Sequence, residues 1–237
     1  MTSMHIGEGL VKEIILLDGS TAARILCASN LIPAPGQYLL AHADGSDAPL
    51  PVSVFPAEST LQSFLAAPPL PIAWTPGTRL YLRGPLGHGF ALPMSARRVA
   101  LVAWDNTSAR LAPLMDLAYK QEAAVTLLSD TQPDDLSLQV EVQPLSALDE
   151  VIKWADYIAV DVERESLPQL RERLGLGQQA KGWVGSGTFI PIEMQVLISM
   201  PMPCGGIAEC GVCAVSVKHN WKMACKDGPV FALNDLI

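Results

Sequence analysis

Four of the chain's five cysteines lie close together near the C-terminus, with a spacing that could bind iron or zinc. They are Cys204, Cys210, Cys213 and Cys225, so the pattern is C-x5-C-x2-C-x11-C. A zinc site of four thiolates usually consists of two short knuckles, whereas only Cys210 and Cys213 form one here. The plant-type [2Fe-2S] pattern has a wide C-x4-C loop, a C-x2-C knuckle and one distant cysteine, and this sequence has one extra residue in the wide loop. The spacing therefore favours a [2Fe-2S] cluster on these four cysteines.

The residues between these cysteines support the same interpretation. A loop around a cluster brings its backbone N–H groups close to sulfur, which glycine permits, and Gly205, Gly206 and Gly211 stand at such positions. A zinc knuckle, or reduced thiols in a core, remains the alternative. Cys27 stands alone in an apolar segment, so we expect it to be a small buried hydrophobic side chain.

The end of the chain resembles a known family. Cys225 is followed by residues 226–231 (KDGPVF), and this C-K-D-G-P-V-F ending is similar to that of the PyrK-type electron-transfer subunit of bacterial heterotetrameric dihydroorotate dehydrogenase. The resemblance extends over the whole chain. It implies a flavin-binding barrel, a nicotinamide-binding α/β domain and a [2Fe-2S] module, in that order. It also implies a catalytic partner subunit with its own FMN, in a hetero-oligomer.

Two segments of the first part resemble the flavin motifs of that family. Residues 51–53 match the last three positions of R-P-x-S, and residues 84–90 (GPLGHGF) resemble a G-P-L-G-N-G-F loop. In that family the arginine of R-P-x-S grips the FAD pyrophosphate, but Leu50 stands here and carries no charge. We therefore expect FAD to bind more weakly unless another cation substitutes. The resemblance places these residues near FAD: Pro51, Val52, Ser53, Gly84, Pro85, Leu86, Gly87, His88 and Gly89.

The segments that would bind NAD depart from the family. Residues 103–108 (AWDNTS) contain no glycine, where relatives place a run of glycines against the NAD pyrophosphate. Trp104 is bulky for that position, and Asp105 would repel a diphosphate. The family's C-G-P stretch has become residues 160–163 (VDVE), and the later residues 185–188 (GSGT) are expected to form only a turn. We therefore expect no NAD site.

The elements that must position these residues fall into three segments. Residues 1–95 are short apolar runs separated by turn signals, which predicts a small antiparallel barrel or sandwich, and the resemblance favours the β-barrel. Residues 96–192 alternate strands with helices, which predicts a parallel sheet with helices on both faces, and residues 193–237 form the small [2Fe-2S] module. The expected fold class is β plus α/β. Strands are expected at 12–17, 22–28, 38–41, 79–82, 99–104, 124–128, 138–142, 157–162, 182–184 and 194–199, and helices at 108–122, 147–154 and 167–174.

Composition limits the partners and the compartment. The chain has 237 residues, a net charge of −8 and a pI near 4.9, which argues against wide contact with nucleic acid or anionic lipid. No apolar run approaches the roughly 20 residues of a membrane-spanning helix, and the N-terminus lacks a signal-peptide pattern. We therefore expect a cytoplasmic protein.

Together these features predict an iron–sulfur electron-transfer subunit of an oxidoreductase complex. The resemblance implies an FMN-containing dihydroorotate-dehydrogenase-like partner, with electrons passing through the cluster and FAD to an acceptor that we expect not to be NAD. No nucleophile-elbow, zinc-protease or phosphate-loop motif is present, so no catalytic residue is assigned. The alternative is a non-redox scaffold or interaction protein, in which a structural metal site fastens the C-terminus and the nucleotide sites have decayed.

Overall fold

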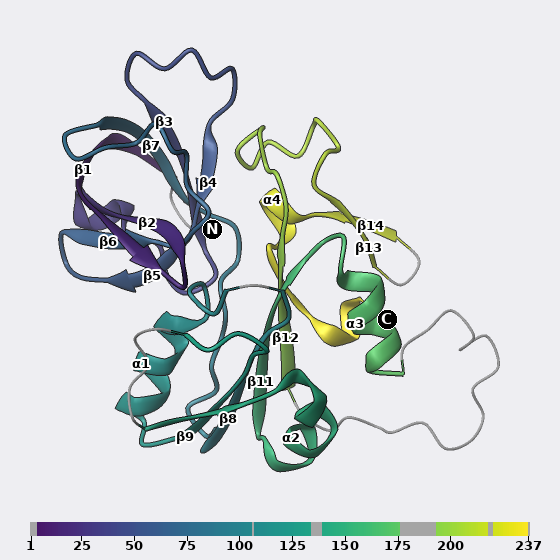
Figure 1. Cartoon of the computed structure of the whole chain (residues 1–237). Helices are drawn as coiled ribbons and strands as arrows, with labels where there is room; N and C mark the ends of the chain where they lie inside the picture. The colour runs from purple at the N-terminus through teal and green to yellow at the C-terminus, as the bar shows by residue number, and fades with distance from the viewer. Residues whose placement is uncertain (1–3, 106, 134–138, 176–192, 218–219, 237) are drawn as a thin grey trace.

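The chain folds into a curled antiparallel sheet, a mostly parallel sheet with helices, and a cysteine-bearing segment between them (Figure 1). The structure is a computed structural model that describes residues 4–105, 107–133, 139–175, 193–217 and 220–236. The expected strand at 182–184 and the residues 185–188 lie outside these ranges. Within them, no helix is both long and apolar enough to cross a bilayer.

The first segment is a seven-stranded antiparallel half-barrel with the strand order β4-β3-β7-β1-β2-β6-β5. It confirms the antiparallel β architecture predicted from the turn signals, and its two outer strands, β4 and β5, are joined only through Phe55. The strands are β1 (His5–Leu17), β2 (Ser20–Cys27), β3 (Tyr38–Ala43), β4 (Val52–Val54), β5 (Pro56–Ser59), β6 (Ser63–Ala66) and β7 (Arg79–Leu86).

The longest strand, β1, begins seven residues earlier than the apolar run at 12–17 predicted. Its N-terminal half contains Gly7 and Gly9, which weaken a strand signal in sequence. In the fold these glycines allow close packing, because a Cβ on Gly7 would lie 2.7 Å from Leu31 Cδ1 and one on Gly9 2.6 Å from Leu82 Cδ1. The absence of a Cβ at these two positions thus lets β1 pack closely against Leu31 and Leu82.

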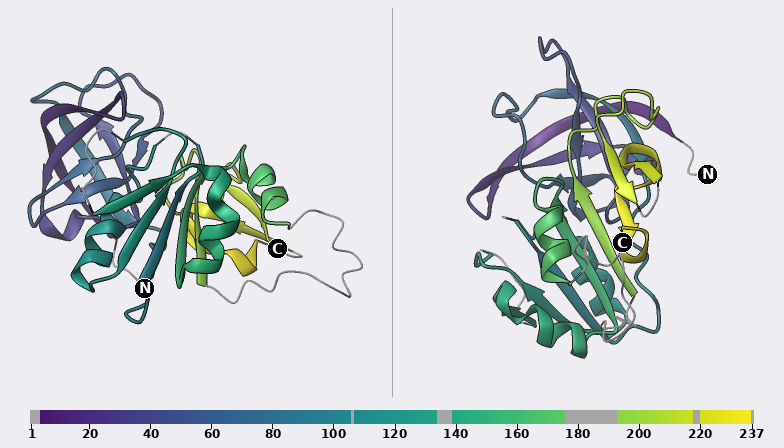
Figure 2. Two further views of the ribbon diagram at one scale, coloured as in Figure 1. Left: turned by 60° about the horizontal axis from the view of Figure 1, so that its bottom comes forward. Right: turned by 90° about the vertical axis from the view of Figure 1, so that its right-hand side faces the viewer.

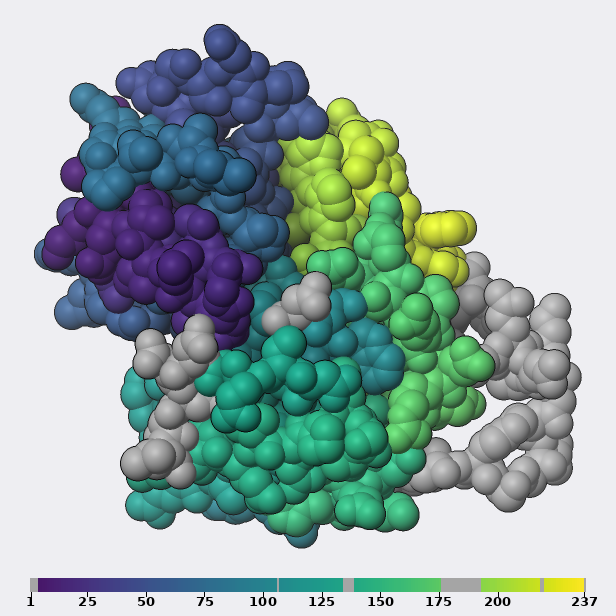
Figure 3. All heavy atoms as spheres, viewed as in Figure 1, coloured from purple at the N-terminus to yellow at the C-terminus, as the bar shows by residue number. Residues whose placement is uncertain are grey.

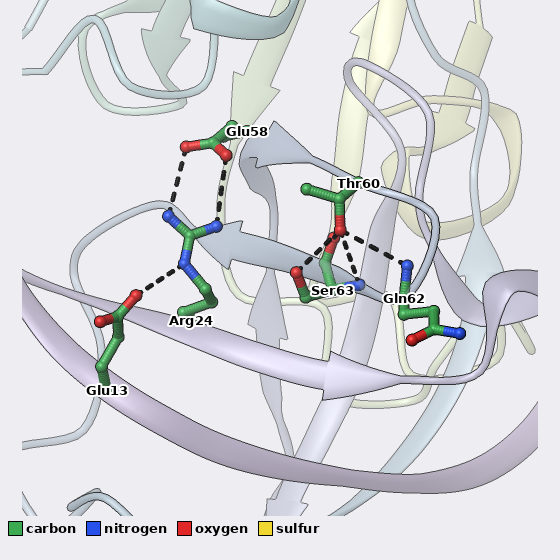
Figure 4. A network of polar contacts seen from close by, with 6 residues as sticks. All are labelled: Glu13, Arg24, Glu58, Thr60, Gln62 and Ser63. Atoms are coloured by element: carbon green, nitrogen blue, oxygen red, sulfur yellow. Dashed lines mark hydrogen bonds and ion pairs between the residues drawn. The ribbon is translucent and has the colours of Figure 1, made fainter.

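A polar network ties together strands on one side of the half-barrel (Figure 4). Arg24 on β2 donates from Nε to Glu13 Oε1 on β1 at 2.7 Å and from both Nη atoms to Glu58 on β5 at 3.3 Å. The Glu58 and Glu13 carboxylates raise the pKa of Arg24 above its ordinary value. Beside them the Thr60 hydroxyl accepts from the backbone N–H of Ser63 at 3.1 Å and closes the β5–β6 turn.

The second sheet has six strands in the order β10-β9-β8-β11-β12-β15. All neighbours are parallel except β15, which runs antiparallel to β12. The strands are β8 (Arg98–Ala103), β9 (Ala124–Leu128), β10 (Val140–Gln143), β11 (Tyr157–Glu163), β12 (Glu193–Ser199) and β15 (Val230–Ala232), and the helices are α1 (Ala112–Lys120), α2 (Leu148–Trp154) and α3 (Leu167–Arg173).

Helices cover both faces of this sheet, as the sequence predicted. Val99 and Leu101 of β8 pack in one buried cluster with Leu114 of α1. The alternate residues of the same strand, Ala100 and Val102, pack in another cluster with residues of α2 and α3. Side chains of a strand point alternately to its two faces, so these two clusters lie on opposite sides of the sheet.

The cysteine-bearing segment shares the core and the sheet of the α/β part. It contains β13 (Ala214–Val217), β14 (Asn220–Met223) and the short helix α4 (Ala224–Asp227), and β15 follows directly. The right-hand view of Figure 2 shows β12 and β15 side by side. The boundary expected at residue 193 therefore falls inside a continuous structure, because β12 hydrogen-bonds to β11 along seven residue pairs.

The loop after β7 offers a test of how tightly the cysteine-bearing segment is attached. Gly87 has φ +74°, and a Cβ there would lie 2.5 Å from the Gly228 carbonyl oxygen and 2.6 Å from Pro229 Cδ. Gly77 also has a left-handed φ of +94° but has nothing within 4 Å of that position. It is therefore the matched control for backbone strain alone.

We expect Gly77→Ala to lower the free energy of unfolding by about 1–2 kcal/mol through strain. Gly87→Ala should cost about 1–3 kcal/mol more, because it also forces the barrel loop away from residues 228–229. Urea unfolding of both variants measures the difference. Equal losses would show that the loop is not packed as tightly as the structure indicates.

Candidate metal centre and adjoining cavity

The four C-terminal cysteines form a chain of contacts although 21 residues separate the first from the last. Cys204 Sγ lies 3.7 Å from Cys225 Sγ, and the backbone N–H of Cys225 donates to Cys213 Sγ at 3.4 Å. Cys204 also contacts the Cys210 thiol. Cys213 and Cys225 are buried, whereas Cys210 is exposed.

The cysteines differ in how readily they ionise. Burial raises the pKa of Cys204, but the Ala208 N–H and the Cys210 and Cys225 thiols outweigh it and lower the value to about 7. Burial, with the neighbouring Cys213, raises the pKa of Cys225 to about 12. Metals bind the thiolate form, so at neutral pH Cys204 is closer to that form than Cys225 is.

The loop from 204 to 213 has the backbone that a cluster requires. Gly205, Gly206, Ala208 and Gly211 all have left-handed φ angles between +61° and +84°. Within this loop the backbone N–H groups of Ala208 and Cys210 hydrogen-bond the Cys204 thiol, as backbone N–H groups do at iron–sulfur sites. Four soft sulfur donors and this backbone fit an iron–sulfur cluster. Among the described residues, no three or more His, Cys, Asp or Glu side chains are grouped so that they could hold a single metal ion.

The half-barrel holds the cysteine-bearing segment from one side, as the space-filling view shows (Figure 3). The Tyr38 hydroxyl donates to the Cys225 carbonyl at 3.1 Å, and the His88 backbone N–H donates to the Gly228 carbonyl. His88 Nδ1 lies 3.1 Å from the Asp227 carbonyl oxygen. Barrel residues thereby fix the segment that contains the fourth cysteine.

Two arginines hold the segment from the α/β side. Arg164, which follows β11, donates from Nη1 to the Val212 carbonyl at 2.6 Å, between Cys210 and Cys213. Arg171 of α3 donates from Nη2 to the Ser216 carbonyl at 3.0 Å. Sequence reasoning missed both, because no local pattern shows which carbonyl a surface arginine will reach.

A cavity of about 520 Å³ adjoins the cysteine loop and contains the first group of predicted flavin residues. Pro51, Val52 and Ser53 line it from the barrel. Its walls are mainly apolar and its polar groups few, which is usual for a site that takes an aromatic cofactor. A larger cavity of about 630 Å³ around Trp74 shares Leu50 and Val52 with it, but no cysteine lines that larger cavity. The smaller cavity is completed by Leu50, Phe55, Ala67, Pro68, Pro69, Arg110, Ser199, Met200, Pro201, Met202, Pro203 and Val212.

The structure does not bring the second group of predicted flavin residues into this cavity. Residues 85–88 instead line a space of about 230 Å³ together with Gly206 and Cys225. Gly84 and Gly89 also pack inside the protein, where a Cβ would lie 2.6 Å from Leu39 Cδ2 and 2.4 Å from the Pro35 carbonyl oxygen. In the described residues this loop supports the cysteine-bearing segment.

The segments that depart from NAD-binding motifs bond to each other. Asp105 accepts the Glu163 backbone N–H and the Ser166 hydroxyl, both at 2.6 Å. Asp161 accepts from Arg110 Nε at 2.7 Å, and their side chains are only 1% and 8% exposed. Burial raises the pKa of Asp161, while the Arg110 guanidinium acts against that rise.

The buried pair gives a second prediction. Asp161→Ala leaves the Arg110 guanidinium buried without its counterion, which should lower the free energy of unfolding by about 3–5 kcal/mol. The double variant Arg110→Met/Asp161→Leu removes both charges and should lose much less. Urea unfolding of the single and double variants measures both effects. Equal destabilisation by both variants would mean that apolar packing, and not charge, decides stability at this point.

Comparison with known proteins agrees with these features. Residues 201–237 match the family model of the iron–sulfur cluster binding domain of dihydroorotate dehydrogenase B. The chain is 28% identical over 172 residues to the dihydroorotate dehydrogenase B (NAD(+)) electron transfer subunit of Desulforamulus reducens, covering 66% of this chain and 64% of that protein. It is 27% identical to the subunit of the same name from Clostridium acetobutylicum, over 86% of each chain.

The fold has known counterparts as well. A chain of the NADH-dependent reduced ferredoxin-NADP oxidoreductase superposes with a TM-score of 0.70 over 96% of this chain and 88% of its own, at 15% identity. A ferredoxin reductase of carbazole 1,9a-dioxygenase gives a TM-score of 0.56 over 73% of this chain and 64% of its own, at 17% identity. These two show a ferredoxin-reductase-like fold. With the matching C-terminal domain and the two sequence relatives, this fold makes the chain similar to PyrK-type electron-transfer subunits.

Proposed function

We propose that this chain is the electron-transfer subunit of a dihydroorotate-dehydrogenase-like complex. It holds a [2Fe-2S] cluster on Cys204, Cys210, Cys213 and Cys225 and a flavin, most simply FAD, in the adjoining cavity. One observation carries the proposal: Pro203 and Val212 line the cavity, and each is bonded directly to one of the cysteines. The two cofactors would therefore share a wall, which favours electron exchange between them.

When bound, the cluster supplies one-electron transfer and the flavin links it to an acceptor. The chain's own residues bind and orient these groups. The backbone N–H groups of Ala208 and Cys210 hydrogen-bond the Cys204 thiol, and the Ser53 hydroxyl lines the cavity, where it can hydrogen-bond a flavin ring. Apolar side chains such as Phe55 and Met202 exclude water from the same cavity.

The surface near the cysteine loop supports a protein partner. Ile207 and Val212 are 51% and 43% exposed and lie on either side of the exposed Cys210 in the sequence. We infer that a protein partner docks beside the proposed cluster, where these two apolar side chains are exposed. The proposed partner is an FMN-containing catalytic subunit in a hetero-oligomer. We place the complex in the cytoplasm, where cysteine thiols stay reduced.

The proposed acceptor is not NAD. Asp105 is held against residues 163–166, and Asp161 is paired with Arg110, so the polar groups of both departing segments bond within the chain. A diphosphate brought to this place would meet the Asp105 carboxylate and no glycine-lined helix N-terminus.

The cluster assignment is tested by metal analysis of the full chain purified without oxygen. About two irons and two sulfides per chain are expected. Cys225→Ser removes a buried ligand and should lose most of both, whereas Cys27→Ser, which changes a cysteine far from the loop, should retain them. Zinc without sulfide in the unmodified protein would favour the structural metal site of a non-redox scaffold instead.

The acceptor assignment is tested by stopped-flow absorption. NADH alone should leave the flavin and cluster bands unchanged, because in the described residues the segment after β8 offers its diphosphate the Asp105 carboxylate and no glycine, whereas dithionite should bleach them. Dithionite also serves as the control that the cofactors are competent. Rapid bleaching by NADH would contradict the proposal and restore NAD as a direct reaction partner.

A further inference from the structure

The cavity beside the cysteine loop has one charged side chain among the residues that line it, and that side chain is Arg110. Leu50, which stands where the family motif has its arginine, lines the same cavity and is 55% exposed. Leu50 and Arg110 therefore both face this cavity. Leu50 belongs to the barrel, whereas Arg110 lies between β8 and α1 of the α/β part.

The surroundings of Arg110 hold its guanidinium in place and leave most of its donors free for a ligand. Nε donates to Asp161 Oδ2 at 2.7 Å, and the guanidinium carbon lies 6.0 Å from the centre of the Phe55 ring. The two terminal nitrogens make no hydrogen bond to any described residue. Neither of them is among the fully buried polar atoms that lack a partner. Four N–H donors of a guanidinium sit on those nitrogens, in the fork that suits phosphate oxygens.

The ion pair with Asp161 lowers the free-energy cost of burying the Arg110 cation at this position. Asp161 balances the charge of Arg110 within the protein, so the guanidinium remains in the cavity wall before a ligand binds. A phosphate can then accept from the terminal nitrogens without displacing Asp161, because the carboxylate bonds only to Nε. Since Phe55 is a barrel residue, the contact forms where the two parts of the chain meet.

We propose that Arg110 binds the phosphate of a flavin nucleotide in this cavity, supplying from the α/β part the positive charge that Leu50 lacks. The proposal rests on the flavin assignment made above and adds a residue and a chemical basis for selectivity. A ligand with a phosphate gains the contact, and one without it does not. The chain should therefore prefer FAD and FMN to riboflavin.

Equilibrium dialysis of the flavin-depleted full chain against FAD, FMN and riboflavin tests this role. The test variant is Arg110→Met/Asp161→Leu, which removes the cation without leaving a buried unpaired carboxylate. It should bind FAD and FMN between about 10-fold and 100-fold more weakly, as expected for a lost hydrogen bond to a charged group, and bind riboflavin unchanged. Urea unfolding verifies that the variant is folded.

Two further variants sharpen the result. Arg98→Met is the matched control, since Arg98 is an α/β arginine that pairs with Asp156 and lines neither this cavity nor the one around Trp74, and it should leave all three affinities unchanged. Adding Leu50→Arg to the test variant should restore part of the FAD affinity, because both positions face one space.

The outcomes separate this proposal from the flavin assignment. Unmodified protein that binds FAD, together with an equal loss for riboflavin or no loss in the test variant, would overturn the role of Arg110 alone. Unmodified protein that binds none of the three flavins would overturn the flavin assignment and this role with it.

Discussion

The antiparallel pairing of β15 with β12 is the constraint on which the site depends. Leu197 pairs with Val230, and the Ile198 N–H donates to the Pro229 carbonyl at 3.0 Å. The chain therefore leaves the sheet after β12 and returns to the same edge after α4. All four cysteines of the motif lie in the segment between β12 and β15, residues 200–229, and the pairing of the two strands holds the ends of this segment side by side. This is why Cys204 and Cys225 meet despite their separation in sequence.

The segment between β12 and β15 shares its core with both larger parts, because its buried side chains belong to one cluster with residues of the half-barrel and of the α/β part. Each neighbour supplies a different contact. The barrel provides the Tyr38 hydroxyl and the loop at His88, and the α/β part provides Arg164 and Arg171. Contacts from both sides hold the backbone around the cysteines, and the same backbone forms one wall of the cavity. A shift of the loop would thus change both proposed cofactor sites together.

The two segments that depart from dinucleotide-binding motifs use their polar side chains for hydrogen bonds within the chain. Asp105 fastens the turn before α3, and Asp161 holds a buried arginine under the barrel. Burying both charges has a desolvation cost that offsets much of their attraction. The pair therefore contributes little to the free energy of unfolding, and its main effect is to hold the Arg110 side chain in one position. The result is a set of contacts that places Arg110 where the α/β part meets the barrel residue Phe55.

Sequence reasoning was strongest where local spacing carries the physical information. The cysteine spacing and its glycines indicated the cluster motif. Turn signals and strand and helix periodicities predicted an antiparallel β segment followed by a parallel sheet covered on both faces, whereas the open, half-barrel form of the first sheet came from the structure. It was weaker for β1, whose glycines hide a strand, and for the short β5 and β6, which have too few residues to show a pattern.

Tertiary contacts between distant residues decided the rest. The loop at residues 84–89 looked like a flavin loop in sequence, but long-range packing sets it against residues 225–229, including a contact across 139 positions. Arg110 reached the cavity through a pairing across 51 positions that no local pattern reveals. By itself the sequence determined which residues could bind a cluster, because ligand type and spacing are local. Only the folded chain determined which cation meets the cavity, because that depends on where separate elements pack.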